Sequence, residues 1–152
     1  MPRIERTAVI VWEGNLARGA GQLTAASSGA FVELPLSLAS RVGAPEGKTS
    51  PEELLAAAHG GCFAMSLAGE LSALEQPPQT LRLECRVVMD EVEGQGHQIV
   101  GSQLTVVARV PEANPETFAR AVELADAGCP FASLLRRAGA LVEVQASLEQ
   151  PG

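Results

Sequence analysis

Residues 50–65 read SPEELLAAAHGGCFAM, and this stretch predicts the helix around which the rest of the chain is organised. A serine cap, a proline at the first helical position and two carboxylates in the first turn are typical of a helix N-terminus. Small and apolar residues then recur every three or four positions, until Pro77 and Pro78 prevent the helix from continuing. We therefore expect a long helix over residues 51–74.

The segments on either side of this helix read as strands and two shorter helices. Val, Ile and Thr content, alternating apolar positions and turn residues define the boundaries. Strands are expected over residues 3–12, 16–23, 30–36, 80–91, 97–110 and 141–148, and helices over 115–127 and 130–138. The order βββ-α-ββ-αα-β predicts an α+β protein, with a mainly antiparallel sheet around a long buried central helix. Residues 1–152 are expected to form a single domain.

Composition and charge exclude several classes of function. The net charge of −7 provides no basic field for phosphates, so we expect no nucleic-acid partner. The longest uncharged run, residues 54–69, is too short to span a membrane, so no membrane association is expected. The apolar segment 8–12 is too short for the core of a signal peptide, which predicts a cytoplasmic protein.

Three cysteines, Cys62, Cys85 and Cys129, are the residues with the most distinctive chemistry. Their spacing contains no CxxC motif and no Cys/His cluster, so we expect neither a metal site nor a cofactor. A permanent disulfide is unfavourable in a reducing compartment. The cysteines are therefore either inert core thiols or include a pair that cycles between reduced and oxidised forms.

Cys62 and Cys129 differ in their expected environments. Burial inside the apolar helix raises the pKa of a thiol such as Cys62, so a reactive role requires a nearby cation, whereas core packing requires none. Cys129 precedes Pro130 and is expected to cap the next helix, where the positive end of the helix dipole favours a thiolate. A small capping residue without chemistry fits that position equally well. The residues alone leave open which cysteine attacks first, while His59 and Cys85 read as structural.

The chain resembles the OsmC/Ohr family of osmotically inducible protein C and organic hydroperoxide resistance proteins. Residues 49–65, TSPEELLAAAHGGCFAM, carry the longer motif, and Cys129-Pro130-Phe131 carries the shorter one. The element order and the Trp-Glu-Gly segment at residues 12–14 also look like the family. The AHGGCF and PEEL forms are more similar to the OsmC branch than to the Ohr branch.

The resemblance implies an intertwined homodimer with a peroxidatic thiol, Cys62, and a resolving thiol, Cys129. It also implies an arginine close to the sulfur, paired with Glu52 of the PEEL motif. In the OsmC branch this arginine is expected in the loop before the long helix, which matches Arg41. In the Ohr branch it is expected in the early hairpin, where Arg18 stands. We favour Arg41 and keep Arg18 as its rival.

The activity implied is reduction of organic hydroperoxides to alcohols in oxidative or osmotic stress defence. Cys62 would become a sulfenic acid and then form a disulfide with Cys129, which an external dithiol or lipoyl-type reductant would reduce. Apolar side chains favour burial of a substrate's alkyl tail, although they equally suit an ordinary core. The candidates for this lining are Phe63, Met65, Phe131 and Leu134. The alternatives are a non-catalytic thiol redox sensor or binding protein, and a structural dimer with inert cysteines.

Overall fold

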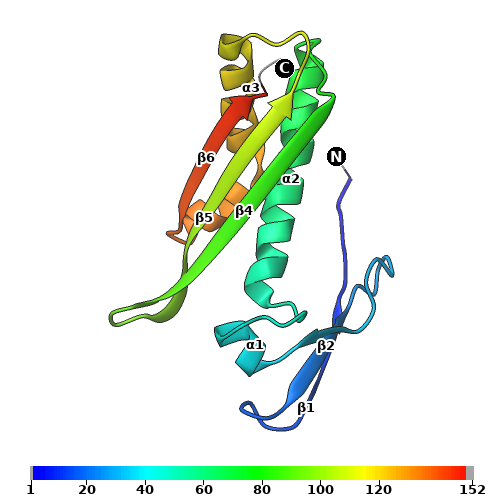
Figure 1. Ribbon diagram of the computed structural model, residues 1–152, viewed down its shortest axis with the longest axis vertical. Helices are drawn as coiled ribbons and strands as arrows, with labels where there is room; N and C mark the ends of the chain where they lie inside the picture. The colour runs from blue at the N-terminus through cyan, green and yellow to red at the C-terminus, as the bar shows by residue number, and fades with distance from the viewer. Residues whose placement is uncertain (1, 150–152) are drawn as a thin grey trace. The chain divides into compact units, whose positions relative to one another are not determined.

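The computed structural model describes residues 2–149, and the chain divides into two compact units, Met1–Pro51 and Glu52–Gly152. Each unit contains one three-stranded sheet. Figure 1 gives the course of the chain and the labels of its helices and strands. The two units are described separately.

The first unit is a small antiparallel sheet followed by a short helix. Strands β1 (Val9–Glu13), β2 (Ala20–Thr24) and β3 (Leu34–Leu36) pair in the order β1-β2-β3, and α1 (Leu38–Val42) follows. The Trp12 ring packs directly against Gly21 of the neighbouring strand. A Cβ atom on Gly21 would lie 2.7 Å from this ring, so only glycine fits there.

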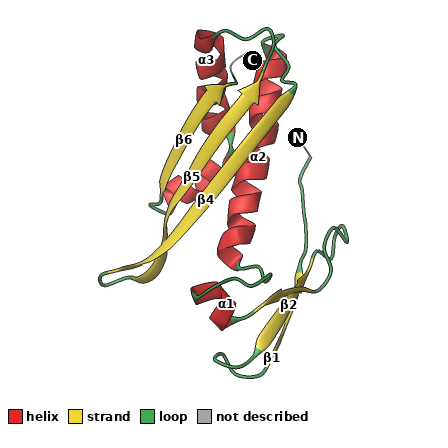
Figure 2. Ribbon diagram, in the orientation of Figure 1, coloured by secondary structure: helices red, strands yellow, loops and turns green. Residues whose placement is uncertain are grey.

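The second unit places helices against one face of its sheet (Figure 2). The long helix α2 (Pro51–Ala73) buries residues at four-residue spacing: His59, Phe63, Leu67 and Leu71. Strands β4 (Thr80–Val92), β5 (Gly96–Arg109) and β6 (Leu141–Leu148) follow in sheet order β4-β5-β6, and helices α3 (Pro115–Gly128) and α4 (Pro130–Arg137) connect β5 to β6. The pair β4–β5 is antiparallel and the pair β5–β6 is parallel.

Two buried clusters hold the second unit together. The larger cluster joins α2, β5 and α3 through residues such as Phe63, Leu104 and Phe118. The smaller cluster surrounds the start of α4 and is formed by Cys129, Ala132, Leu135, Ala140 and Val142. Cys62 and Phe131 pack against this second cluster. The arrangement therefore brings the middle of α2 to the start of α4.

The expected α+β class and element order are confirmed, with three local differences. Strand β1 begins at Val9 rather than at residue 3. The helix α1 was not expected, and it is set by Ser37, whose side chain accepts a hydrogen bond from the Ser40 N–H. The strands form two sheets, and the last pair is parallel because two helices cross between β5 and β6. The assignment of residues 1–152 to a single domain stays a prediction.

One helix among the described residues, α2, is long and apolar enough to cross a membrane by length and composition alone, with a mean hydropathy of 1.3. This is weak support for a span, because the core helix of a soluble protein passes the same test. Four side chains of α2 are buried within the unit. We interpret it as a core helix with one face exposed.

Two leucines on strands of the same sheet provide a test of this core. Leu104 of β5 is 1% exposed, whereas Leu141 of β6 is 60% exposed. Leu104→Ala should lower the free energy of unfolding by about 2–5 kcal/mol, because it leaves a cavity, and Leu141→Ala by less than about 1 kcal/mol. Urea denaturation of both variants measures the difference. Equal losses would contradict the assignment of Leu104 to the core.

Candidate active site

The structure brings together two of the three cysteines from distant parts of the chain. Cys62 lies in the middle of α2. Cys129 ends α3 and caps α4 at the corner between these helices. Cys62 packs against the buried cluster that contains Cys129, the Cys129 side chain raises the pKa of the Cys62 thiol, and both cysteines are reduced. A disulfide requires its two sulfurs to approach one another, and this contact supplies the starting geometry.

The two thiols differ in accessibility. Cys129 is 1% exposed and is a member of the small cluster that contains Ala132 and Leu135. Cys62 packs against this cluster but is only partly buried. Within the described chain, a small molecule can therefore reach Cys62 more readily than Cys129.

The surroundings of Cys62 disfavour its thiolate. Burial raises the pKa of the Cys62 thiol, and the neighbouring Cys129 side chain raises it further. Hydrogen bonds from the Phe131 backbone and the Ser66 side chain lower this pKa, but the net direction is upward. These groups hold the sulfur in place without supplying the positive charge that a reactive thiolate needs.

Cys129 occupies the predicted N-cap position of α4 but does not act as a side-chain cap. Its backbone is extended, with φ −81° and ψ 112°, and its sulfur makes no capping hydrogen bond to α4. The sulfur contacts Cys62 instead. The start of α4 therefore determines where the Cys129 thiol lies, although the thiol forms no capping hydrogen bond with that helix.

His59 and Cys85 form a separate buried group. His59 Nδ1 lies 2.7 Å from Ser102 Oγ, and Cys85 Sγ lies 3.5 Å from the same hydroxyl and 3.8 Å from His59 Nδ1. Burial lowers the pKa of His59, so the ring is held neutral. A Cβ atom on Gly60 would lie 3.4 Å from the Cβ of Cys85, so the backbone of α2 at Gly60 lies close to this side chain of β4.

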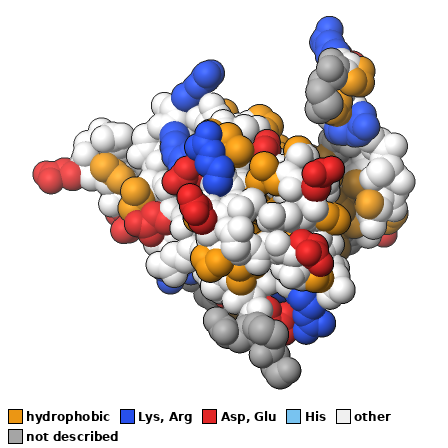
Figure 3. All heavy atoms as spheres, turned by 90° about the horizontal axis from the view of Figure 1, so that it is seen from above, with side chains coloured by type: hydrophobic (Ala, Val, Ile, Leu, Met, Phe, Trp, Pro, Cys, Tyr) orange, Lys and Arg blue, Asp and Glu red, His pale blue; other side chains and the backbone are white. Residues whose placement is uncertain are grey.

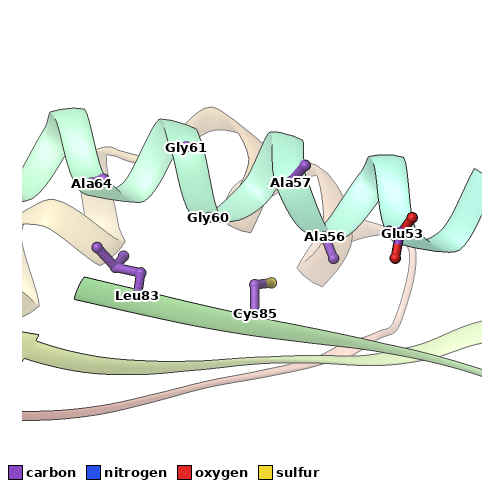
Figure 4. Close-up of a pocket in the computed structure, with 8 residues that line it drawn as sticks. All are labelled: Glu53, Ala56, Ala57, Gly60, Gly61, Ala64, Leu83 and Cys85. Atoms are coloured by element: carbon purple, nitrogen blue, oxygen red, sulfur yellow. The ribbon is translucent and has the colours of Figure 1, made fainter. Parts of the chain in front are cut away.

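Two surface pockets flank the central elements of the second unit. One, of about 430 Å³, lies between α2 and β4, and Figure 4 shows Cys85 and Leu83 facing the small residues of the helix across it. The other, of about 520 Å³, is lined by Pro130, Phe131, Ser133, Leu134 and Arg137 of α4. Phe131 thus lines this pocket and, like Cys62, packs against the smaller cluster.

The remaining residues expected at the site lie in several places. Phe63 is fully buried in the larger core cluster, whereas Met65 is 74% exposed on α2. Arg18 lies in the turn between β1 and β2 and Arg41 in the last turn of α1, both in the first unit and both exposed. Glu52 lies in the first turn of α2.

Ser66 and the Phe131 N–H were not recognised from the sequence as neighbours of the sulfur. Ser66 follows Cys62 by four residues, and residues at this spacing share one face of a helix, which is the signal that could have identified it. The Phe131 N–H could not be identified in this way, because nearly every residue type carries a backbone N–H. Within residues 2–149, no group of three or more His, Cys, Asp or Glu side chains could hold a metal ion.

Comparisons with known proteins match this chain to one family. The OsmC-like protein family matches residues 43–145. Peroxiredoxin OsmC of Escherichia coli (strain K12) is 33% identical over 125 residues, which cover 82% of this chain and 85% of that protein, and Peroxiredoxin OsmC of Shigella flexneri gives the same values.

Solved structures share the fold. An organic hydroperoxide resistance protein OsmC from Legionella pneumophila has a TM-score of 0.67 at 20% identity, with 97% of this chain and 100% of that chain covered. OhrB of Bacillus subtilis has a TM-score of 0.65 at 23% identity, with 94% and 98% covered. An OsmC-like protein from Vibrio cholerae has a TM-score of 0.77 at 13% identity, with 95% and 100% covered.

The sequence match spans most of the chain, and the structural matches share its α+β architecture. The relatives with curated names are peroxiredoxins, so a peroxidase role is supported at the level of the family. This chain belongs to the OsmC family.

Proposed function

We propose that the chain is a thiol-dependent peroxidase that reduces organic hydroperoxides to alcohols through Cys62 and Cys129. The observation that carries this proposal is the contact between a partly exposed thiol on α2 and a buried thiol at the start of α4. Membership of a family that contains peroxiredoxins supports it. Such activity would serve defence against oxidative or osmotic stress.

The reaction divides into three steps. The Cys62 thiolate attacks one oxygen of the hydroperoxide, the O–O bond breaks, and the alkoxide takes a proton and leaves as the alcohol. Cys62 is then a sulfenic acid. The Cys129 sulfur attacks the Cys62 sulfur, a disulfide forms, and the hydroxyl group leaves as water with the proton from Cys129. An external dithiol or lipoyl-type reductant reduces the disulfide and restores both thiols.

The first step requires a cation, and no cationic side chain among residues 52–149 lowers the pKa of Cys62. Burial raises the pKa of Cys62, and the two hydrogen-bond donors beside it lower this pKa only in part. We assign the activating charge to Arg41, held by Glu52 through charge-assisted hydrogen bonds. Arg18 is the rival. This assignment rests on the family resemblance.

The pocket on α4 fits the alkyl part of the substrate. Phe131 and Leu134 line it, and both Phe131 and Cys62 pack against the smaller cluster, so the pocket lies near the reacting thiol. Burial of an alkyl chain against these side chains would favour organic hydroperoxides over hydrogen peroxide. Phe63 would support the substrate-binding surface from the buried core, and Met65 would contribute to it from the exposed face of α2.

A homodimer would cover apolar surface that the single chain leaves exposed. In β1, Val9, Ile10, Val11 and Trp12 are 51%, 55%, 53% and 38% exposed. In α2, only 22% of the most apolar 18-residue stretch is buried. The exposed face of this helix carries Ala57, Gly61, Met65 and Gly69. Small residues at four-residue spacing allow a second helix to approach closely, and exposed apolar faces of this size favour a protein partner. We therefore propose a second copy of this chain as the cover.

The same proposal includes no nucleic-acid or membrane partner and a cytoplasmic location. Figure 3 shows acidic side chains beside the basic ones on the face in view, and the net charge of −7 opposes binding to nucleic acid. The mechanism uses no metal, cofactor or membrane. A reducing cytoplasm would keep the thiols available for each turnover.

One observation favours a second candidate function, a non-catalytic thiol redox sensor of the same fold. Cys62 and Cys129 lie close together, and a switch requires only that such a pair form one disulfide and then remain oxidised. A sensor would form the same disulfide but would not sustain consumption of hydroperoxide in the presence of a dithiol. Steady-state kinetics with cumene hydroperoxide and dihydrolipoamide separates the two functions.

The thiol cycle can be followed by intact mass after one equivalent of cumene hydroperoxide. The wild type should lose two hydrogens as the disulfide forms, and Cys129→Ser should instead accumulate a sulfenic acid on Cys62. Cys85→Ser is the matched control and should behave as the wild type. No change in mass in any variant would mean that the thiols are inert.

The activating arginine can be identified from pH–rate profiles of peroxide consumption. Because the thiolate is the reactive form and burial raises the pKa of Cys62, removal of the cation should raise this pKa further. The rate at neutral pH should fall about tenfold for each unit of pKa, and the loss should diminish as the pH rises. We expect this for Arg41→Ala and not for Arg18→Ala. The opposite result would assign the role to Arg18.

A further inference from the structure

An ion pair spans the corner at which Cys129 stands. Asp126, near the end of α3, precedes Cys129 by three residues, and Arg136, near the end of α4, follows it by seven. Arg136 Nη2 lies 2.6 Å from Asp126 Oδ2. The Cys129 N–H donates to the Asp126 carbonyl at 3.3 Å. The Asp126–Arg136 ion pair therefore links α3 to α4, and the Cys129 N–H bond fixes the residue at which the two helices meet.

The same pair reaches the neighbouring strand. Arg136 Nη2 also donates to the carbonyl of Val142 in β6, at 3.4 Å. The Asp126 side chain is 23% exposed and that of Arg136 42% exposed, so the pair is less screened than the other ion pairs described. It fixes the ends of α3 and α4 and the start of β6 around the cluster that contains Cys129.

The carboxylate of Asp126 also acts on α2. His59 lies one turn before Cys62 on that helix, and its pKa is lowered by burial, raised in part by the charge of Asp126 and lowered by the charge of Arg136. Asp126 Oδ1 and His59 Nε2 are both buried, and neither has a hydrogen-bond partner among residues 2–149. Asp126 therefore faces the helix of the first thiol while it holds the corner of the second.

From this geometry we propose that Asp126 and Arg136 are positioning residues for the condensation of Cys129 with oxidised Cys62. The proposal rests on the proposed peroxidase cycle. In this step the Cys129 thiol loses its proton, its sulfur forms the disulfide bond, and the hydroxyl group of the Cys62 sulfenic acid leaves with that proton as water. Neither Asp126 nor Arg136 contacts a reacting sulfur. They hold the ends of α3 and α4 in place, so that the Cys129 thiol stays next to the Cys62 thiol.

The attack on the peroxide should not depend on this corner, because it takes place at Cys62 on α2. Condensation should depend on it, because displacement of a reacting atom by about 1 Å can slow a step by up to about 100-fold. The two steps therefore separate a positioning role from a general loss of stability. A purely structural role would slow both steps together or neither.

The test is a single turnover of Asp126→Asn with one equivalent of cumene hydroperoxide, quenched at intervals in dimedone, a sulfenic acid trap. Peroxide consumption should remain within about twofold of the wild type, while disulfide formation slows about 10- to 100-fold and dimedone-labelled Cys62 accumulates. Glu149→Gln is the control, because it disrupts the exposed Arg109–Glu149 pair and should alter neither step. Asp126→Glu, which keeps the charge, should restore much of the condensation rate.

Each further outcome decides the proposal. Disulfide formation at the wild-type rate in Asp126→Asn would overturn it and leave the peroxidase cycle intact. Equal slowing of both steps would also overturn it, since that result indicates a structural role alone. If Asp126→Asn does not fold, Arg136→Lys, which keeps the positive charge but loses the planar fork, is judged by the same criteria. A wild-type protein that forms no disulfide would refute the proposed function itself.

Discussion

The contact between Cys62 and Cys129 is the interaction on which the site depends. No covalent bond joins the two reduced thiols, so non-covalent interactions must hold them together. The smaller cluster does this with short side chains, among them Ala132 and Ala140, which let α4 approach the neighbouring elements closely. The low aromatic content of the chain, 3%, is consistent with such close packing by small residues.

Burial holds the two thiols together but also disfavours the reactive thiolate form of Cys62. The removal of water fixes Cys129 against Cys62 and at the same time raises the pKa of Cys62. The Phe131 N–H and the Ser66 hydroxyl offset this only in part, because neutral donors stabilise a thiolate less than a full positive charge does. The second unit is therefore suited to hold the pair, whereas activation of the Cys62 thiolate requires a positive charge in addition to these neutral donors.

The sequence signals were strongest where a local rule sets the structure. The cap and proline at the start of α2 and the Cys129-Pro130 step at the start of α4 define helix starts by themselves. The five-residue helix α1 is too short to show a helical period, and its Ser37 cap resembles that of a turn. The β-rich residues 3–8 lie outside β1, because pairing with β2 begins at Val9 opposite Thr24. A β-strand extends only over the residues that pair with a neighbouring strand.

Long-range features of the site were less accessible from the sequence. The two thiols could be identified because their motifs resemble a known family, whereas the Asp126–Arg136 pair exists only because α3 and α4 fold back at Cys129. The exposed faces add a second lesson. The sequence predicts α2 as a buried central helix, yet much of its surface, and of the apolar residues in β1, is uncovered in the single chain. Since a hydrophobic pattern specifies burial but not the molecule that provides it, the same pattern can encode assembly as well as fold.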